Sequence, residues 1–208
     1  MPGGPEPFDR IDESDDADFY SSPRLVNHIE VGAIETLRVA YGELLPDSGH
    51  ILDLMSAWRS HLPRAASSEA EHRFTRVTGL GMNEIELSEN PQLDEWVVHD
   101  LNSNPVLPFE PAAFDAAVCT VSIQYLVHPI EVLRDLRRVL RPGGVAALAF
   151  SNRCFPTKAV SIWNAAGDAH HCELTETYLT MAGYEGVRVL RLDSPDDPVF
   201  VATGQASD

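Results

Sequence analysis

Apolar residues recur along the chain at intervals that predict alternating helices and strands. One helix is expected to begin at the Ser22-Pro23 pair, with serine as N-cap and proline at the first helical position, and to end before residues 46–49. Similar spacing predicts helices over residues 129–140 and around residues 170–182. Short apolar runs predict seven strands, at residues 50–55, 76–81, 95–100, 115–121, 145–150, 186–192 and 198–203.

This order of elements predicts an α/β fold with one doubly wound, mostly parallel seven-stranded sheet, because crossovers between parallel strands place helices on both faces. The last two strands have no helix between them and are expected to form an antiparallel pair, which gives the sheet an antiparallel edge strand. The crossover after the first strand lacks an apolar stripe, so only a short helix at about residues 66–73 is expected there. Residues 141–144, Arg-Pro-Gly-Gly, predict a sharp turn.

Composition narrows the class of protein. The chain has 208 residues, 44% of them hydrophobic, which suits one domain with a substantial core. Its formal net charge of −17 repels phosphate backbones and anionic lipids, so neither a nucleic-acid nor a membrane partner is expected. Three scattered cysteines, no signal-peptide pattern and no long apolar run favour a reducing, cytoplasmic location.

Acidic residues are concentrated near the N-terminus. Residues 1–18 hold seven of them against Arg10 alone, together with three prolines and two glycines. This composition predicts a disordered, solvated acidic tail that does not touch the core. The expected organisation is a tail over residues 1–18, an N-terminal helix or lid over residues 19–46, and one α/β domain over residues 47–208.

Residues 114–150 carry a series of motifs in a recognisable order. A Phe-Asp-x-x-x-Cys strand from residue 114, a Gln-Tyr-Leu-x-x-Pro connection from residue 124, an amphipathic helix and Leu-x-Pro-Gly-Gly from residue 140 follow one another. In this series the chain resembles the class I S-adenosylmethionine-dependent methyltransferases, specifically the broad type 11 group, over about residues 48–203. The resemblance implies a Rossmann-like fold, S-adenosylmethionine as cofactor and methyl transfer to a small-molecule acceptor.

The resemblance also implies where the cofactor binds. Asp53 would anchor the loop after the first strand and the methionine end of the cofactor, and Asp100 would accept a hydrogen bond from the adenine amino group. The further cofactor contacts that it implies are Met55, Ser56, Ala57, Met82, Asn83, Leu101, Thr120 and Val121. Thr120 and Val121, together with Tyr125, would line the sulfonium and the methyl acceptor.

Two departures from the family pattern concern this cofactor site. The family's loop reads Asp-x-Gly-x-Gly-x-Gly, and its glycines correspond here to Met55, Ala57 and Arg59. Because glycine adopts positive φ freely and lets a ligand approach the backbone, the loop is expected to change conformation or to place the methionine moiety differently. Gly81 stands where the family commonly has a ribose-binding acid. Asn83 is either a contact to one ribose hydroxyl or an N-cap, since a glutamate follows three residues later.

Two residues are candidates for catalysis. His61 follows the divergent loop and is either a general base with a pKa of about 6.5 or a surface histidine. Tyr125 is either a wall of the acceptor site or part of the core. The run His170-His171-Cys172 resembles a metal cluster, but adjacent side chains diverge, so a structural role and no metal are expected. Methyl transfer to a thiol, an amine or an activated hydroxyl depends mainly on positioning and desolvation.

The segment from Phe19 to His28 is aromatic and basic between acidic neighbours. The resemblance implies a lid over the pocket, in which Arg24 pairs with a carboxylate, the cofactor's own among the candidates, while Tyr20 and His28 face the acceptor. The alternative is a packed surface helix whose Arg24 neutralises the acidic tail.

Three functions remain open at this point. The first is S-adenosylmethionine-dependent methyl transfer to a small molecule, which the retained Asp53 and Asp100 favour. The second is a catalytically inactive binding or regulatory module with the same fold, which the loss of three glycines and of the ribose acid favours. The third is an enzyme of this fold that accepts a different adenosyl compound.

Overall fold

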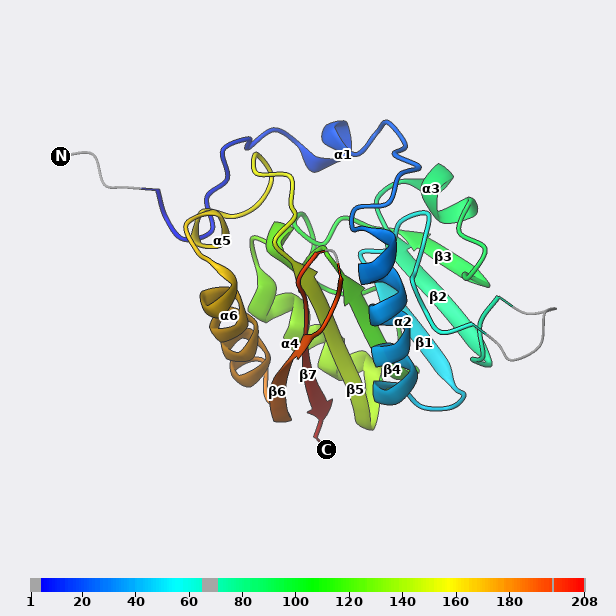
Figure 1. Ribbon diagram of the computed structural model, residues 1–208. Helices are drawn as coiled ribbons and strands as arrows, with labels where there is room; N and C mark the ends of the chain where they lie inside the picture. The colour runs from blue at the N-terminus through cyan, green and yellow to red at the C-terminus, as the bar shows by residue number, and fades with distance from the viewer. Residues whose placement is uncertain (1–4, 65–70, 196, 208) are drawn as a thin grey trace.

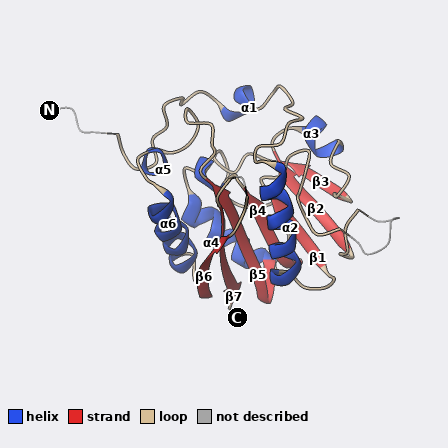
Figure 2. Ribbon diagram, viewed as in Figure 1, coloured by secondary structure: helices blue, strands red, loops and turns tan. Residues whose placement is uncertain are grey.

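Seven strands form one sheet at the centre of the computed structural model, which describes residues 5–64, 71–195 and 197–207 (Figures 1 and 2). The strands are β1 (His50–Leu54), β2 (Arg76–Gly81), β3 (Glu95–Val98), β4 (Phe114–Thr120), β5 (Leu140–Ser151), β6 (Tyr184–Leu192) and β7 (Val199–Ala206). Each corresponds to one of the seven predicted strands.

The sheet has the strand order β3-β2-β1-β4-β5-β7-β6. Strands β1 to β5 pair in parallel, with Leu52 opposite Thr78 on one side and Ala117 on the other. Strand β7 runs antiparallel to both β5 and β6. The predicted fold class and the antiparallel pair at the sheet edge are confirmed. The strand order reverses between β1 and β4, and in such sheets ligands bind beyond the carboxyl ends of the strands at that point.

Helices cover both faces of the sheet (Figure 1). The helical segments are α1 (Asp16–Phe19), α2 (Val31–Leu44), α3 (Glu84–Ser88), a 3₁₀ turn (Ile123–Tyr125), α4 (Pro129–Val139), α5 (Ser161–Asn164) and α6 (Asp168–Met181). Helix α2 packs Leu37 and Tyr41, both fully buried, against one face of the sheet. Helices α4 and α6 pack on the opposite face in a second core cluster. The helices predicted over residues 129–140 and around 170–182 are confirmed.

The N-terminal helix begins later than predicted, at Val31 and not at residue 22. Residues 16–30, called the N-terminal strap below, instead cross the end of the sheet where β1, β2 and β4 finish. Residues 16–19 of this strap form α1, and beyond it several backbone groups bond to the domain: Tyr20 O, for example, accepts a hydrogen bond of 2.8 Å from Asn83 Nδ2. A helix over these residues would have to give up such bonds.

The acidic segment is not a detached tail in its described part, residues 5–18. Asp16 is only 5% exposed and bonds to Arg10 Nη1 at 2.7 Å and to Lys158 Nζ at 3.1 Å. Lys158 is the only lysine of the sequence and is completely buried. The expectation of a solvated tail is wrong here, because a carboxylate of this segment forms buried ion pairs with Arg10 and Lys158. Residues 1–4 lie outside the described residues.

Two connections shape the ends of the sheet. The described parts of the β1–β2 crossover, residues 55–64 and 71–75, contain no helix, and the short helix expected at about residues 66–73 falls mostly outside the described residues. The turn predicted at residues 141–144 lies inside β5 as a shift of register against β4. Gly143 has a φ of +78° there, a conformation that glycine adopts without strain.

Candidate active site

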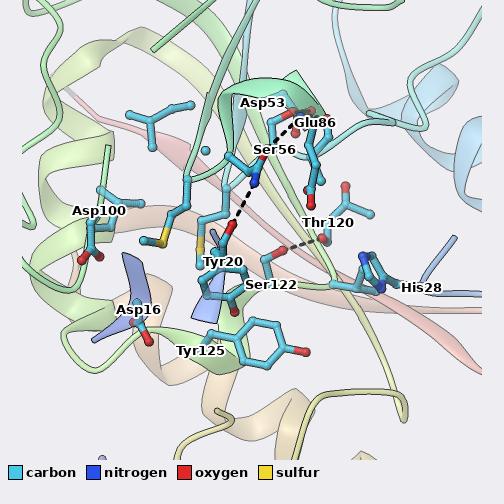
Figure 3. A pocket seen from close by; sticks show the side chains of 18 of the residues that line it. Asp16, Tyr20, His28, Asp53, Ser56, Glu86, Asp100, Thr120, Ser122 and Tyr125 are labelled. Carbon is cyan, nitrogen blue, oxygen red and sulfur yellow. Dashed lines mark hydrogen bonds between the residues drawn. The ribbon is translucent and has the colours of Figure 1, made fainter. Parts of the chain in front are cut away.

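A pocket lies at the carboxyl ends of β1, β2 and β4, beneath the N-terminal strap. All fifteen residues predicted for cofactor binding, catalysis or the lid line it: Tyr20, Arg24, His28, Asp53, Met55, Ser56, Ala57, His61, Met82, Asn83, Asp100, Leu101, Thr120, Val121 and Tyr125. Figure 3 shows Asp100 and His28 at opposite sides of the pocket, with Tyr20 and Ser122 between them. The topology therefore brings these residues together, while their individual roles remain proposals.

Asp53 is a buried carboxyl at the end of β1, only 2% exposed. Ser56 Oγ donates a hydrogen bond of 2.6 Å to its Oδ2 atom. Burial raises the pKa of Asp53 to about 7, although hydrogen bonds from Ser56 and Ser60 act in the opposite direction. The carboxyl therefore changes protonation near neutral pH, and a cationic ligand beside it would favour the ionised form.

The divergent loop after β1 keeps one glycine-like feature. Met55, at the first of the family's glycine positions, has a φ of +57°, in the left-handed region that glycine adopts most readily. Ser56 N donates to Leu80 O at 2.8 Å, which holds the loop against the end of β2. A Cβ atom on Gly81 would lie 2.2 Å from Ser56 O. The packing of the loop therefore excludes any side chain at residue 81, including the family's ribose-binding acid.

Asn83 uses both ends of its amide within the protein. Its Oδ1 atom accepts from the backbone N–H groups of Ile85 and Glu86 at 3.0 and 3.1 Å, which caps α3. Its Nδ2 atom donates to the carbonyls of Tyr20 and Ser21 at 2.8 and 3.1 Å. The N-cap interpretation is confirmed. The alternative, a ribose contact by Asn83, has no free donor or acceptor to support it in this arrangement.

Asp100 forms a turn after β3. Its Oδ1 atom accepts from Asn102 N at 2.9 Å, and its Oδ2 atom accepts from Ser103 Oγ at 2.6 Å. Asp100 therefore stabilises this turn. Each carboxylate oxygen has a second lone pair, so the same side chain can still accept from an adenine amino group. Leu101, 3% exposed, lies next to it as expected for the side of a ring site.

The loop after β4 contains backbone strain. Val121 has a φ of +47°, which is a genuine outlier for a β-branched residue. Two hydrogen bonds hold it there: Val121 N donates to Ala149 O at 2.8 Å, and Gln124 Nε2 donates to Val121 O at 2.9 Å. Strained residues that the surrounding structure enforces are concentrated at functional sites. The neighbouring Thr120 hydroxyl is hydrogen-bonded to Tyr41 at 2.8 Å.

Neither predicted catalytic residue titrates near neutral pH. Burial lowers the pKa of His61 to about 4, and the positive charges of Arg38 and Arg59 act in the same direction. This corrects the expectation of a histidine with an ordinary pKa, and its 7% exposure also excludes a surface position. Burial raises the pKa of Tyr125 to about 12, and its hydroxyl accepts from Phe155 N at 2.9 Å. Both side chains are therefore neutral at pH 7, and neither is an effective base.

The N-terminal strap places Arg24 among aromatic rings at the pocket. The guanidinium carbon lies 4.5 Å from the ring centroid of Phe19, 5.7 Å from that of Tyr20 and 5.6 Å from that of Phe155. The ring of Phe155 also contacts His28, with centroids 5.5 Å apart. The three predicted lid residues therefore all lie on a segment that covers the pocket.

Sequence reasoning missed several residues that line the pocket: Asp16, Glu86, Asn102, Ser122 and Phe155. Phe155 and Ser122 follow the ends of β5 and β4. Their position after a strand end is the same feature that identified the predicted residues, so it could have identified these two as well. Glu86 was interpreted only through its capping position. Nothing in the acidic composition around Asp16 distinguishes one buried carboxylate from its solvated neighbours.

The histidines of α6 have structural partners. His171 Nε2 lies 3.0 Å from Trp163 O, and the two rings stack with centroids 4.0 Å apart. His170 Nδ1 lies 3.0 Å from Glu173 Oε2 on the surface. Across residues 5–64, 71–195 and 197–207, no three His, Cys, Asp or Glu side chains gather as a metal site. The same described ranges contain no helix that is long and apolar enough to cross a membrane.

Comparisons with known proteins find similarity to methyltransferases. Residues 64–148 match a family model described as a methyltransferase domain, and the match begins just beyond the divergent loop. Among solved structures, a chain in the complex of the Haloferax volcanii Trm112 methyltransferase activator with a methyltransferase is 16% identical, with 85% of this chain and 91% of that chain covered and a TM-score of 0.64.

Two further solved structures share the fold. The S-adenosylmethionine-dependent methyltransferase from Mesorhizobium loti is 15% identical, with 82% of this chain and 97% of that chain covered and a TM-score of 0.55. The 4+2 cyclase SpnF is 14% identical, with 82% of this chain and 80% of that chain covered and a TM-score of 0.58. At these identities the likeness is one of fold.

The match of residues 64–148 to a methyltransferase domain and the seven-stranded sheet support the predicted resemblance to the class I S-adenosylmethionine-dependent methyltransferases. The methyltransferase domain match supports S-adenosylmethionine as the cofactor and methyl transfer as the reaction. The predicted fold is confirmed, and the domain match supports the predicted family and cofactor, although the glycine-rich loop of the family is replaced.

Proposed function

We propose that this protein transfers the methyl group of S-adenosylmethionine to a small-molecule acceptor bound beneath the N-terminal strap. The observation that carries the proposal is the convergence of fifteen predicted residues, from four strand ends and the strap, on one pocket. A covered pocket suits a small acceptor, because a polymer would need an open path across the strap. The net charge of −17 supports the same acceptor class, since it disfavours nucleic acids.

The polar groups of the pocket suit the cofactor at both ends. Asp100 and Leu101 would hold the adenine, and Glu86 is the pocket carboxylate that would replace the missing ribose acid at β2. Asp53 lies where the sulfonium and ammonium charges would come, and its pKa of about 7 allows it to ionise in response. Arg59 has no acidic partner among the described residues and would bind the methionine carboxylate.

The cofactor supplies an electrophilic methyl group, whose bond to sulfur breaks with its electron pair left on sulfur while the acceptor's lone pair forms the new bond. The chain's own residues position the reactants and exclude water. Tyr20 and Tyr125 offer ring faces that attract a cationic sulfonium. Because His61 and Tyr125 are both neutral at pH 7 and poor bases, the acceptor must present a nucleophile that needs no strong base.

A non-catalytic binding module is the second candidate, and one observation favours it. The strap itself donates or accepts hydrogen bonds at Asn83 and Glu86, beside the end of β2 where the family binds ribose. A strap held in this way could occupy the place of a ligand. The cyclase SpnF also has this fold, so the fold alone does not determine the reaction.

A reducing, cytoplasmic location belongs to the same proposal. The three cysteines are free: Cys119 is buried, and Cys154 and Cys172 are partly buried. Burial raises the pKa of all three thiols, which keeps them in the less reactive protonated form.

A transfer assay tests the proposed function. The protein is incubated with S-adenosylmethionine labelled in its methyl group and with an ultrafiltered extract that contains only small molecules. We expect label in a small-molecule product, and a rate at least about tenfold lower for Asp100→Ala, since losing one charge-assisted hydrogen bond costs about 1.5 kcal/mol or more. Asp193→Ala, an exposed residue outside the pocket, is the matched control.

The outcomes of this assay separate the candidates. Cofactor binding without transfer to any small molecule would contradict the proposed enzyme and support the binding module. Label in a protein or nucleic-acid fraction would contradict the small-molecule acceptor.

A further inference from the structure

The polar atoms of the pocket that lack partners are nitrogen atoms. Arg24 Nη1 is buried and has no hydrogen-bond partner among the described residues, and the same is true of His61 Nδ1. Arg59 also lines the pocket, and its guanidinium lies over the Trp58 ring at 4.3 Å without a carboxylate partner in the described ranges. The guanidinium nitrogen of Arg24 can only donate, and a buried donor without a partner is costly, so a ligand that fills this part of the pocket must bring an acceptor.

Each carboxylate of the same pocket already accepts at least one hydrogen bond. Asp16 bonds to Arg10, Lys158 and Asn102, and Asp53 accepts from Ser56. Glu86 accepts from Arg24 N at 2.6 Å, and Asp100 accepts from Asn102 and Ser103. Among the charged groups that line this pocket, the buried atom without a hydrogen-bond partner in the described residues therefore belongs to a cation, Arg24.

Two arginines from different elements share this positive charge. Arg59 belongs to the loop after β1, next to the Asp53 end of the pocket, where the proposed function places the methionine moiety. Arg24 belongs to the strap and is surrounded by the rings of Phe19, Tyr20 and Phe155. The cofactor carries one carboxylate, which Arg59 would bind. Arg24 is then left for a second anion.

We propose that the methyl acceptor is a small planar carboxylate whose anionic group binds Arg24 and whose flat body packs against the rings of Phe155 and Tyr20. This inference rests on the proposed function, since it divides the two arginines between cofactor and acceptor. Stacking on rings leaves the guanidinium edge free for in-plane hydrogen bonds, which is the geometry that suits a carboxylate. Only one of the two terminal nitrogens is engaged, since Nη2 donates to Phe19 O at 2.9 Å.

Paired probes test this assignment on protein saturated with S-adenosylhomocysteine. Benzoate, salicylate and cinnamate are each compared with their neutral amides by calorimetry. We expect each acid that binds to do so at least about tenfold more tightly than its amide, the equivalent of about 1.4 kcal/mol. Arg24→Met should remove this preference and leave the affinity for S-adenosylhomocysteine within about threefold of wild type.

Arg59→Met is the complementary variant. It should lower the affinity for S-adenosylhomocysteine by at least about tenfold. The affinity for methylthioadenosine, which lacks the methionine carboxylate, should stay unchanged. The backbone N–H of residue 24 is retained in Arg24→Met, so its bond to Glu86 can still hold the strap. Protection of Lys158 from an amine-reactive reagent reports that the strap is still closed, since Lys158 is buried beneath it.

Three results would overturn the inference: equal binding of acids and amides, no binding of any of the acids to the loaded protein, or a loss of S-adenosylhomocysteine affinity in Arg24→Met as large as in Arg59→Met. Failure of the proposed function gives a different result, in which wild-type protein does not bind S-adenosylhomocysteine at all.

Discussion

Replacing Lys158 with methionine is expected to lower the free energy of unfolding by about 3 kcal/mol, since removal of one partner from a buried ion-pair network is strongly destabilising. Lys158 is completely buried, and its ammonium contacts Asp16 at 3.1 Å and the Ser14 carbonyl at 2.7 Å. The variant keeps an apolar stem and loses the ammonium group, with its charge and its hydrogen bonds to Ser14. Urea unfolding of the variant and of wild type measures the difference.

The same contacts predict a chemical readout for the strap. Because Lys158 is the only lysine, an amine-reactive acetylating reagent has two targets, the α-amino group and Lys158. In native wild type we expect only the α-amino group to react. Asp16→Asn weakens the closed strap, so acetylation of Lys158 should accelerate by at least about tenfold, which corresponds to about 1.4 kcal/mol.

Arg153→Met is the control for this experiment. Arg153 bonds to Glu30 and Asp197 at the other end of the strap, but it is largely exposed, so its loss should change the reactivity of Lys158 little. Rapid acetylation of Lys158 in native wild type, or equal rates in all three proteins, would contradict the burial of Lys158 beneath the closed strap.

Replacing Asp53 with asparagine should change the pH dependence of stability. The pKa of Asp53 in the folded protein, about 7, lies above the value of about 3.9 for an unfolded chain, so folding takes up a proton between these pH values. The free energy of unfolding of wild type therefore falls as the pH rises through this window. Asparagine does not titrate, so the variant should gain about 3 kcal/mol relative to wild type between pH 4 and pH 7.

Urea unfolding at a series of pH values measures this gain in ligand-free protein. Asp115→Asn is a control of opposite sign: although burial acts to raise the pKa of Asp115, hydrogen bonds from His50 and Arg141 lower it. Its contribution to stability is therefore lost only at the acid end of the series. Parallel pH profiles for wild type and Asp53→Asn would mean that Asp53 is ionised in the folded protein.

The sheet was predictable because its signal is local. Each buried strand is a short apolar run, and the alternation with helices determines the parallel connections. The start of the N-terminal helix was not predictable in this way. The backbone of residues 20–26 bonds to Asn83, Glu86 and Trp58, which lie far away in the sequence, and periodicity does not report such partners.

The site was predictable in position and less so in role. Strand ends meet at one edge of a parallel sheet, so Asp53, Asp100 and Thr120 had to line the same region. Their partners depend on packing. The carbonyl of Ser56 excludes a side chain at Gly81, and the Asn83 amide already forms hydrogen bonds to the N-terminus of α3 and to the strap. The burial of Lys158 could not be predicted from the sequence, because a lone lysine in a loop is usually exposed.

Titration with S-adenosylhomocysteine tests the central claim most directly, because the whole account requires this pocket to bind an adenosyl cofactor. Calorimetry on wild type should give a dissociation constant in the micromolar range, and Asp100→Ala should raise it by at least about tenfold while Asp193→Ala leaves it unchanged. An absence of both heat and thermal stabilisation at millimolar ligand would contradict the assignment of the pocket. Binding that is unaffected by Asp100→Ala would show that the adenine lies elsewhere.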